Sequence, residues 1–233
     1  MKLLVAIPAL NEQSTIASAI SDVRLYLPDA EILVINDGST DRTQEVVESL
    51  NVKCLNFPFN MGVGAAMRAA FTYANKEGFA QVLQFDADGQ HKASEGMKLV
   101  EQSPDVEIVI GTRFLDSREY QVGRLRRLTM KILASVLSRR LGCRLTDVTS
   151  GFRLTRNDAV KFFSCNYPPE YLGDTVESLL LAGSQGFKIT EVQVTMNQRQ
   201  GGNPSQGIFK LVAYLLRVIS VVLTSFLHYR RKH

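Results

Sequence analysis

The chain has 233 residues, of which 45% are hydrophobic and 21% are charged, and it contains no tryptophan. This length predicts one large domain, or one domain with an appendage, and the composition excludes a disordered chain. The three cysteines are scattered, which favours a reducing compartment and excludes a metal site built on closely spaced cysteines. The opening MKLLVAIPALNE is too briefly apolar for a signal peptide, so we expect a first strand there and a cytoplasmic protein.

The formal net charge of +4 hides an uneven distribution along the chain. Residues 118–144 carry a net charge of +7 and residues 199–233 a net charge of +6, so the remainder carries −9. A basic face on an otherwise acidic protein predicts a polyanionic partner, which is a membrane surface, a nucleic acid or a phosphorylated substrate.

Short aliphatic runs alternate with helix-like stretches in the first half of the chain. The expected strands are KLLVAIPAL, EILVINDG, VKCLNFP, QVLQFDAD and VEIVIGTR. The expected helices are Gln13–Leu27, Asp41–Leu50, Gly64–Asn75 and Ser94–Gln102. This alternation predicts βαβ units and an α/β fold with a mostly parallel central sheet flanked by helices.

The pattern changes after residue 117. We expect a basic amphipathic helix, or a pair of helices, over Arg118–Leu141, and then a loop, TDVTSGFRLTRNDAV, that runs into a strand and a helix. A helix over Thr175–Gln185, a strand in FKITEVQVTM and a last helix over Ile208–Arg231 follow. QRQGGNPSQG is the one break that separates a tail, so we predict a domain over residues 1–204 and an appended amphipathic helix over 205–233.

Polar clusters follow three of the expected strands, at Asn11–Glu12, Asn36–Asp37 and Asp86–Asp88. Ligands bind beyond the carboxyl ends of the strands in such sheets, so the three clusters predict one site. Strand alternation would point Asp86 and Asp88 the same way. Their carboxylates suit Mg²⁺ or Mn²⁺ and leave coordination positions for a substrate's phosphates. The alternative interpretation is a solvated Asp-Gly turn.

Six blocks in order carry a family resemblance: IPALNEQSTI, VINDGSTDRT, NMGVGAAMRAAFTYA, FDADGQH, VIGTRF and DVTSGFRL. Over residues 2–205 the chain resembles the family 2 glycosyltransferases. These have the GT-A fold and use nucleotide-diphosphate sugars, and the likeness is to the members that act on dolichyl or undecaprenyl phosphate. The resemblance implies an inverting transfer that depends on Mg²⁺ or Mn²⁺.

The resemblance also assigns residues. It implies that the metal is held by Asp86 and Asp88, and that the nucleotide sugar is bound by Pro8, Leu10, Glu12, Asp37, Asp86, Ala87 and Arg199. It places Gln90, Ser150 and Arg153 on the acceptor side, and gives catalytic roles to Asp88, Arg113, Asp147 and Arg153. Many members have an acid where this chain has Asn36, which still accepts a hydrogen bond. His91 is either a supporting or a catalytic residue.

The acceptor decides whether a base is needed. A hydroxyl acceptor must lose a proton to a carboxylate, whereas a lipid phosphate is already anionic and chiefly needs Arg and Lys to hold it. Arg113, Ser150 and Arg153 favour the lipid phosphate. Asp147 is a base or a positioning group by resemblance, or it caps the following turn, and Glu170 and Asp174 are the rival bases. Without tryptophan the Q-x-x-R-W motif of processive synthases is absent, which predicts a single transfer.

Two basic segments predict a peripheral place on the inner face of the cell membrane. Arg124, Arg126, Arg127 and Lys131 alternate with aliphatic residues. In the last segment, Leu211–Leu227 offers 17 residues with Arg217 near the middle. Spanning needs about 20 apolar residues, so we expect an interfacial anchor rather than a docking or dimer helix, or a spanning one. A small membrane-protein partner would supply a missing anchor.

Several rival functions stay open or are excluded. The glycines of NMGVGAA follow the third strand, not the first, and no G-x-x-x-x-G-K-S/T occurs, so dinucleotide and P-loop sites are excluded. Few aromatics accompany the basic segments, which disfavours a nucleic-acid partner. A transferase acting on a hydroxyl of a lipid-linked or cell-envelope glycan, a non-catalytic nucleotide-sugar-binding or membrane-binding module, and a homo-oligomer stay open.

Overall fold

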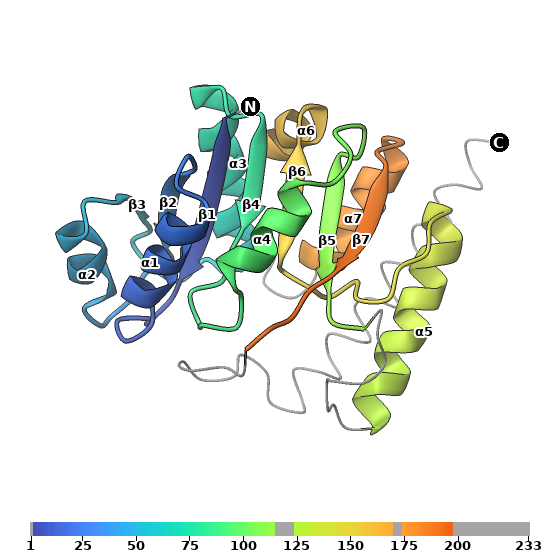
Figure 1. The fold of residues 1–233 in the computed structure, drawn as a ribbon, viewed down its shortest axis with the longest axis horizontal. Helices are drawn as coiled ribbons and strands as arrows, with labels where there is room; N and C mark the ends of the chain where they lie inside the picture. The colour runs from blue at the N-terminus through green and yellow to red at the C-terminus, as the bar shows by residue number, and fades with distance from the viewer. Residues whose placement is uncertain (1, 115–123, 170–173, 198–233) are drawn as a thin grey trace.

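A computed structural model describes residues 2–114, 124–169 and 174–197, with side chains from Met130 in the second range and from Thr175 in the third. Its centre is a seven-stranded sheet with the order β3-β2-β1-β4-β6-β5-β7 (Figure 1). The strands are β1 (Leu3–Ala9), β2 (Glu31–Asn36), β3 (Lys53–Asn56), β4 (Gln81–Gln84), β5 (Ile108–Thr112), β6 (Arg153–Arg156) and β7 (Ile189–Gln193).

All strands but one run in the same direction. β1 is parallel to β2 and β4, β2 to β3, and β5 to β7, whereas β6 is antiparallel to both β4 and β5. The first residues of β6 therefore lie at the same edge of the sheet as the last residues of its neighbours. The predicted α/β fold with a mostly parallel sheet is confirmed.

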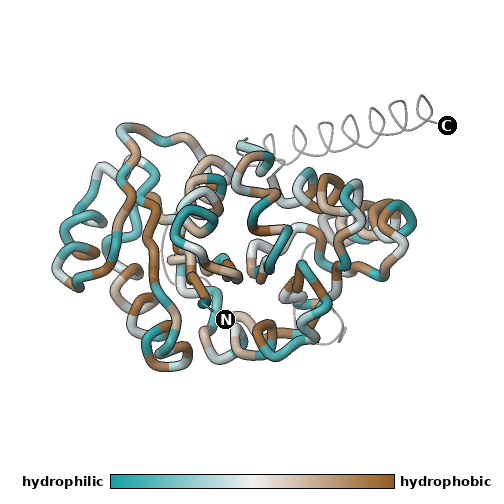
Figure 2. The backbone as a smooth tube through the Cα atoms, turned by 90° about the horizontal axis from the view of Figure 1, so that it is seen from above, coloured by the Kyte–Doolittle hydropathy of each residue, from teal (hydrophilic) through white to brown (hydrophobic). Residues whose placement is uncertain are grey.

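Helices cover both faces of the sheet (Figure 1). One face packs on α1 (Ile16–Tyr26), α2 (Thr43–Ser49) and α4 (Ala93–Val100). The other packs on α3 (Val63–Glu77), α5 (Arg124–Leu141), α6 (Asp158–Asn166) and α7 (Asp174–Ser184). Along β1, Val5 and Ile7 enter the first layer while Leu4 and Ala6 enter the second, because successive strand side chains point to opposite faces. The helices change between polar and apolar along their turns, as Figure 2 shows.

The predicted elements match the described ones except at their ends. The predicted strand QVLQFDAD ends at Gln84, and the residues that follow form a turn in which Gly89 has a φ of 79°. Strand alternation therefore does not set the directions of Asp86 and Asp88, and that part of the prediction is wrong. The segments 118–123 and 198–233, with the predicted last helix, lie outside the described residues, so the division at residue 204 stays a prediction.

The predicted basic helix is present as α5 and is amphipathic where its side chains are described. Leu133, Ala134 and Leu137 are buried against the core, while Lys131 and Arg139 are exposed. Among the helices that the structure describes, none has the length and apolar character needed to cross a membrane.

Arg156, at the end of β6, is a buried brace on the side of the sheet away from the polar clusters. Its guanidinium donates to the backbone carbonyls of Leu99, Val100, Gln102 and Ser103 at 2.7–3.2 Å, where α4 ends. Cations are favourable at helix C-termini, although burial lowers the pKa of this side chain. The bond network fixes β6 against α4 and so fixes the start of β6 at the opposite edge.

Candidate active site

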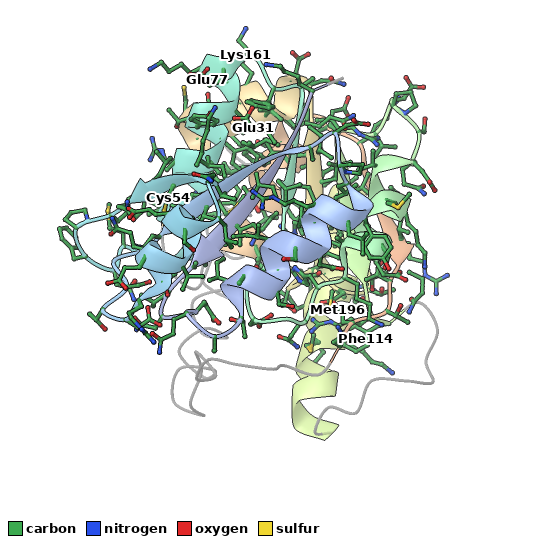
Figure 3. All side chains as sticks on the ribbon, turned by 60° about the vertical axis from the view of Figure 1, so that its left-hand side comes forward. Glu31, Cys54, Glu77, Phe114, Lys161 and Met196 are labelled. Carbon is green, nitrogen blue, oxygen red and sulfur yellow. The ribbon has the colours of Figure 1, made fainter. Side chains whose placement is uncertain are left out.

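The three predicted polar clusters lie at one edge of the sheet, where β1, β2 and β4 end (Figure 1). The ends of β5 and β7 and the start of β6 share this edge. In Figure 3, Phe114 and Met196, which follow β5 and β7, lie at one end of the molecule, and Glu77 and Lys161 lie at the other. The structure thus brings together residues that lie next to six strands and far apart in the sequence.

Asp86 and Asp88 lie in the turn after β4. The side chain of Asp86 is 37% exposed, whereas Asp88 is buried and its Oδ1 accepts the backbone N–H of Gln90 at 3.0 Å. Gly151 faces Asp86, because a Cβ atom built there would lie 3.5 Å from Asp86 Oδ2 and 3.0 Å from Gln84 Nε2. A side chain at this position would crowd the Gln84 amide, whereas its contact with the Asp86 carboxylate would be an ordinary one.

These two carboxylates fit a divalent ion that takes its other ligands from the substrate. Among the described residues no group of three or more His, Cys, Asp or Glu side chains forms a closed metal site. Carboxylate oxygens are the donors that Mg²⁺ and Mn²⁺ prefer, and both ions commonly share their coordination with substrate phosphates. Two acids one residue apart at an open sheet edge match this arrangement.

His91 supports the turn. Its Nδ1 accepts the backbone N–H of Asp86 at 2.8 Å, which assigns the ring proton to Nε2, 3.6 Å from Asp86 Oδ2. The ring stacks on Phe152 at a centroid distance of 4.5 Å and meets Phe85 edge-on. Burial lowers the pKa of His91, against the opposing effect of Asp86 and Asp88, and because Nδ1 accepts a hydrogen bond the ring is neutral. Of its two predicted roles, this geometry favours the supporting one.

Asp37 holds a loop on the predicted nucleotide side of the site. Its buried carboxylate accepts the backbone N–H of Met61 at 2.7 Å and of Gly62 at 2.8 Å, where α3 begins. Burial raises the pKa of Asp37, and the two backbone hydrogen bonds oppose that rise. The neighbouring Gly38 has a φ of 70°, and a Cβ atom there would lie 2.4 Å from the backbone of Phe59. The hydrogen bonds of Asp37 and the close approach of Gly38 thus hold the loop 57–62 against the end of β2.

The loops after β1 and β2 are tied to each other by short polar contacts. Asn11 takes a φ of 56°, and its Oδ1 accepts the backbone N–H of Thr40 at 2.8 Å. Glu12 is buried, and its carboxylate accepts the hydroxyl of Thr15 at 2.6 Å. The side-chain oxygen of Asn36 accepts the backbone N–H of Ser39, so this residue accepts a hydrogen bond as predicted. These contacts order the predicted nucleotide-binding loops.

The other predicted nucleotide-binding residues have different positions. Pro8 and Leu10 are half-buried at the end of β1, next to Glu12, and Ala87 is buried between the two aspartates. Arg199 lies outside the described residues, so its role stays a prediction.

Arg113 and Asp147 form an ion pair on the predicted acceptor side. Arg113 Nε donates to Asp147 Oδ2 at 2.8 Å, and its terminal nitrogen donates to Oδ1 at 3.2 Å. The Asp147 side chain is fully buried and that of Arg113 is 15% exposed. Asp147 also accepts the hydroxyl of Thr149 at 3.1 Å. A carboxylate in this bidentate pair is suited to positioning Arg113, and taking a proton would weaken the pair.

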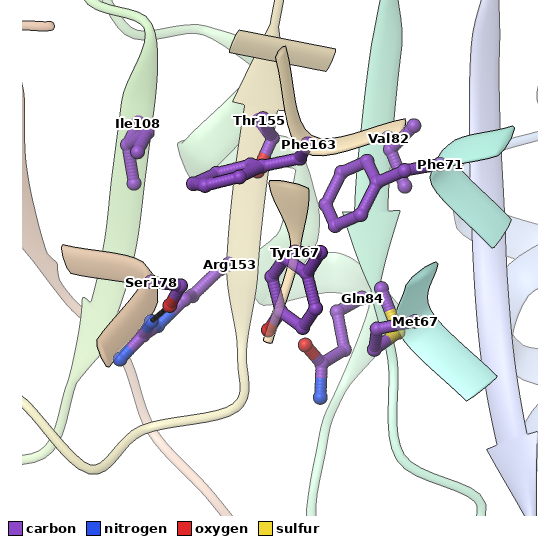
Figure 4. Close-up of a pocket in the computed structure, with 10 residues that line it drawn as sticks. All are labelled: Met67, Phe71, Val82, Gln84, Ile108, Arg153, Thr155, Phe163, Tyr167 and Ser178. Carbon is purple, nitrogen blue, oxygen red and sulfur yellow. Dashed lines mark hydrogen bonds between the residues drawn. The ribbon is translucent and has the colours of Figure 1, made fainter. Parts of the chain in front are cut away.

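Arg153 and Ser150 bind the protein's own backbone. The Arg153 guanidinium donates to the carbonyls of Ser150, Thr175 and Val148 at 2.7–2.8 Å and to Ser178 Oγ at 3.1 Å. It lines a narrow pocket behind the site together with Gln84 (Figure 4). The Ser150 hydroxyl donates to the Gly111 carbonyl at 2.7 Å. Both residues brace the loop before β6, and their predicted contacts to an acceptor stay predictions.

The segment after β7 lies over the turn that carries the two aspartates. The backbone N–H of Asn197 donates to the carbonyl of Gln90 at 2.9 Å, and its side chain donates to the carbonyl of Gly89 at 3.3 Å. Thr195 donates its hydroxyl to Glu95 at 2.9 Å. Gln90 thus contributes backbone contacts on both sides, and the chain leading to Arg199 starts beside the candidate metal ligands.

Sequence reasoning missed one side chain of the site. Glu191, in the middle of β7, accepts hydrogen bonds from Thr146 and Asp147, which lie on the loop between α5 and β6. A charged residue inside the alternating strand ITEVQV was the available signal. It did not reveal the partner, because the contact joins residues 44 and 45 positions apart.

The fold is that of the GT-A class. This structure superposes on the crystal structure of glucosyl-3-phosphoglycerate synthase from Mycobacterium tuberculosis in complex with Mn²⁺, UDP and phosphoglyceric acid. The TM-score is 0.73 and the sequence identity 22%, and the match covers 96% of this chain and 78% of that one. The family model described as Glycosyl transferase family 2 matches residues 4–163. The chain belongs to glycosyl transferase family 2, and the predicted family is confirmed.

Curated relatives extend over most of the chain. Polyprenol monophosphomannose synthase of Mycolicibacterium smegmatis is 26% identical, covering 92% of this chain and 87% of that protein. Dolichyl-phosphate beta-glucosyltransferase ALG5D of Trichomonas vaginalis is 32% identical, covering 91% and 71%. Undecaprenyl-phosphate mannosyltransferase of Micrococcus luteus is 27% identical, covering 87% and 86%.

Proposed function

We propose that this protein transfers one sugar, with inversion, from a nucleotide-diphosphate sugar to a polyprenyl phosphate at the cytoplasmic face of a membrane. One bond breaks between the anomeric carbon and the donor diphosphate, and one forms between that carbon and an oxygen of the lipid phosphate. The curated relatives named above are all named for transfer to, or synthesis of, a polyprenyl or dolichyl phosphate sugar, which supports this acceptor.

The observation that carries the proposal is the buried pair of Arg113 and Asp147. Of the three predicted bases, Asp147 is the one whose side chain lies within the described residues, and its carboxylate is engaged by Arg113 and Thr149. An acceptor hydroxyl would need a base to remove its proton, whereas a phosphate arrives as an anion and needs a cation to hold it. A paired Asp147 that orients Arg113 fits the second requirement.

On the donor side, Asp86 and Asp88 would hold Mg²⁺ or Mn²⁺. The ion would neutralise charge on the diphosphate as it leaves. Glu12, Asp37 and the loops they order would bind the nucleoside, and Arg199 would close over the diphosphate.

The test uses the purified full chain with undecaprenyl phosphate in detergent, Mn²⁺ or Mg²⁺, and radiolabelled UDP-, GDP- and dTDP-sugars. We expect label in the organic phase with one donor, and a loss of at least about 100-fold in Asp88→Ala because leaving-group charge is no longer stabilised. Asp105→Ala, at an exposed loop residue, is the matched control and should keep full activity. Nucleotide release without labelled lipid would contradict the proposed acceptor.

A further inference from the structure

Glu191 binds the loop that carries Asp147. Both carboxylate oxygens of Glu191 lie 2.7 Å from the backbone nitrogen of Thr146, and Oε2 also accepts the Thr146 hydroxyl at 2.7 Å. Oε1 accepts the backbone N–H of Asp147 at 2.8 Å. Three donors from two adjacent residues thus converge on one ionised side chain, and such charge-assisted bonds are about twice as strong as neutral ones.

The adjacent strands β5 and β7 position both partners of the Arg113–Asp147 ion pair. Glu191 is the register partner of Ile110 in β5, and Arg113 follows the end of that strand. The hydroxyl groups of Thr112 and Thr146 add a 2.8 Å contact between β5 and the loop. Asp147 is therefore fixed from β7 and Arg113 from β5, with two adjacent strands setting the distance between them.

We propose that Glu191 is a positioning residue for the acceptor: through the loop 146–147 it holds Asp147 so that Arg113 presents its guanidinium to the acceptor phosphate. This inference rests on the proposed function for the identity of the acceptor. It predicts a loss confined to the acceptor side, because the loops that bind the nucleotide make their contacts through β1, β2 and α3.

A rival interpretation is that Glu191 merely fastens β7 to the rest of the domain. The chain provides a matched control for it. Glu107, at the opposite edge of the same strand pair, accepts the backbone N–H of Lys188 on its Oε2 at 2.8 Å. Glu107 thus joins the start of β5 to the start of β7 through a carboxylate and one backbone donor, away from Arg113. A purely structural role of Glu191 predicts that both glutamine variants lose stability, Glu191→Gln more because Glu191 accepts three donors, and that neither variant loses acceptor constants selectively.

The experiment compares Glu191→Gln with Glu107→Gln in the full chain. The glutamine amide nitrogen cannot accept a hydrogen bond, so at least one of the three donors loses its partner. We expect kcat/KM for undecaprenyl phosphate to fall about 10- to 100-fold in Glu191→Gln, because small displacements of positioned groups cost that much. The KM for the donor should stay at its wild-type value, and Glu107→Gln should retain both constants.

An NMR readout tests the inference without any acceptor. The Arg113 Nε–H, identified by its absence in Arg113→Lys, is hydrogen-bonded to Asp147 and should be protected from exchange in the wild type and in Glu107→Gln. We expect this protection to be lost in Glu191→Gln. Protection that is retained, or acceptor constants equal to those of Glu107→Gln, would overturn the inference. If the wild type labels no lipid, the proposed acceptor fails, and the NMR result still decides the role of Glu191.

A second pair of variants serves if Glu191→Gln does not fold. Thr146→Val removes the hydroxyl bond to Glu191 and keeps the backbone bonds, while Thr146→Ser keeps that hydroxyl. A fall in Arg113 protection in Thr146→Val that Thr146→Ser restores supports the inference. Equal protection in the two variants contradicts it.

Discussion

The two halves of the site edge are built differently. On the predicted nucleotide side, Asp37 at the end of β2 accepts two backbone N–H groups of the loop between β3 and α3. On the acceptor side, Asp147 pairs with the charged Arg113 and is itself held by contacts from β7 to the loop before the antiparallel strand β6. The first half fixes loop shape, and the second fixes the position of one cation.

Because of this difference, substitutions in the two halves should affect folding stability and sugar transfer in different ways. Removing a loop-shaping contact should change donor binding and folding together. Removing one member of the charged pair should leave an uncompensated buried charge, and replacing both members should restore folding without restoring transfer.

The largest stability effect is expected from Arg113→Met. It leaves Asp147, which is fully buried, without its cation, and should lower the free energy of unfolding by about 3 kcal/mol. The double variant Arg113→Met/Asp147→Leu should recover most of that loss, because an apolar pair leaves no unpaired charge, while sugar transfer stays absent. Urea unfolding and the transfer assay measure the two properties.

The pair of Lys98 and Glu95, in which Lys98 is exposed and Glu95 also accepts hydrogen bonds from Thr195, is the control for this prediction. The Lys98 side chain is 50% exposed, so Lys98→Met should cost only about 0.5 kcal/mol. Equal losses from the two single variants would mean that burial does not distinguish the pairs.

A smaller effect is expected on the nucleotide side from Gly38→Ala. Its φ of 70° strains any other residue, and the new Cβ would meet the backbone of Phe59 at 2.4 Å. We expect a loss of about 2–3 kcal/mol together with weaker nucleotide binding, measured by urea unfolding and calorimetry. Gly78→Ala has a similar φ of 74° but nothing within 4 Å of its Cβ, so it should cost about 1 kcal/mol and leave nucleotide binding intact.

Some features of the candidate site could be predicted from the sequence, and others could not. The place of Asp37, Asp86 and Asp88 at this edge was predictable because each lies within a few residues of the end of an aliphatic strand, and parallel strands bring their carboxyl ends to one edge. The seven strands and most helices were predictable for the same local reason. The resemblance to known transferases added Arg113 and Asp147 as separate residues.

The contacts between distant residues were not predictable. Nothing in SGFR indicates that β6 inserts antiparallel between β4 and β5, which is what turns Gly151 towards Asp86. The binding of Glu191 to Asp147 depends on that insertion and on the register of β7. The sequence did not reveal that the strand ends at Gln84. The alternating pattern continues to Asp88, although the chain turns before Gly89.

The smallest effect concerns Asp37 and its pH dependence. Burial raises the pKa of Asp37 above the ordinary value of 3.8, so the folded state binds its proton more tightly than the unfolded chain does. This contribution to stability is present at low pH and is lost as pH rises through the folded pKa. Asp37→Asn lacks it and also loses one acceptor for the two backbone donors, at a cost of about 1 kcal/mol.

We therefore expect the stability deficit of Asp37→Asn relative to the wild type to shrink as pH rises from about 4 to about 6. Urea unfolding of both proteins across that range measures the deficit. A deficit that grows with pH would mean that the bonds to Met61 and Gly62 outweigh burial.

If the acceptor is a lipid phosphate held by Arg113, as we propose, a matched pair of lipids will distinguish it from a hydroxyl acceptor. Undecaprenyl phosphate and undecaprenol are supplied in the same detergent with the donor that the wild type uses, and labelled lipid is measured for each. We expect labelling of undecaprenyl phosphate alone, and loss of that labelling in Arg113→Met/Asp147→Leu. Labelling of undecaprenol at a comparable rate would contradict it, because the enzyme would then be taking a proton from a hydroxyl group.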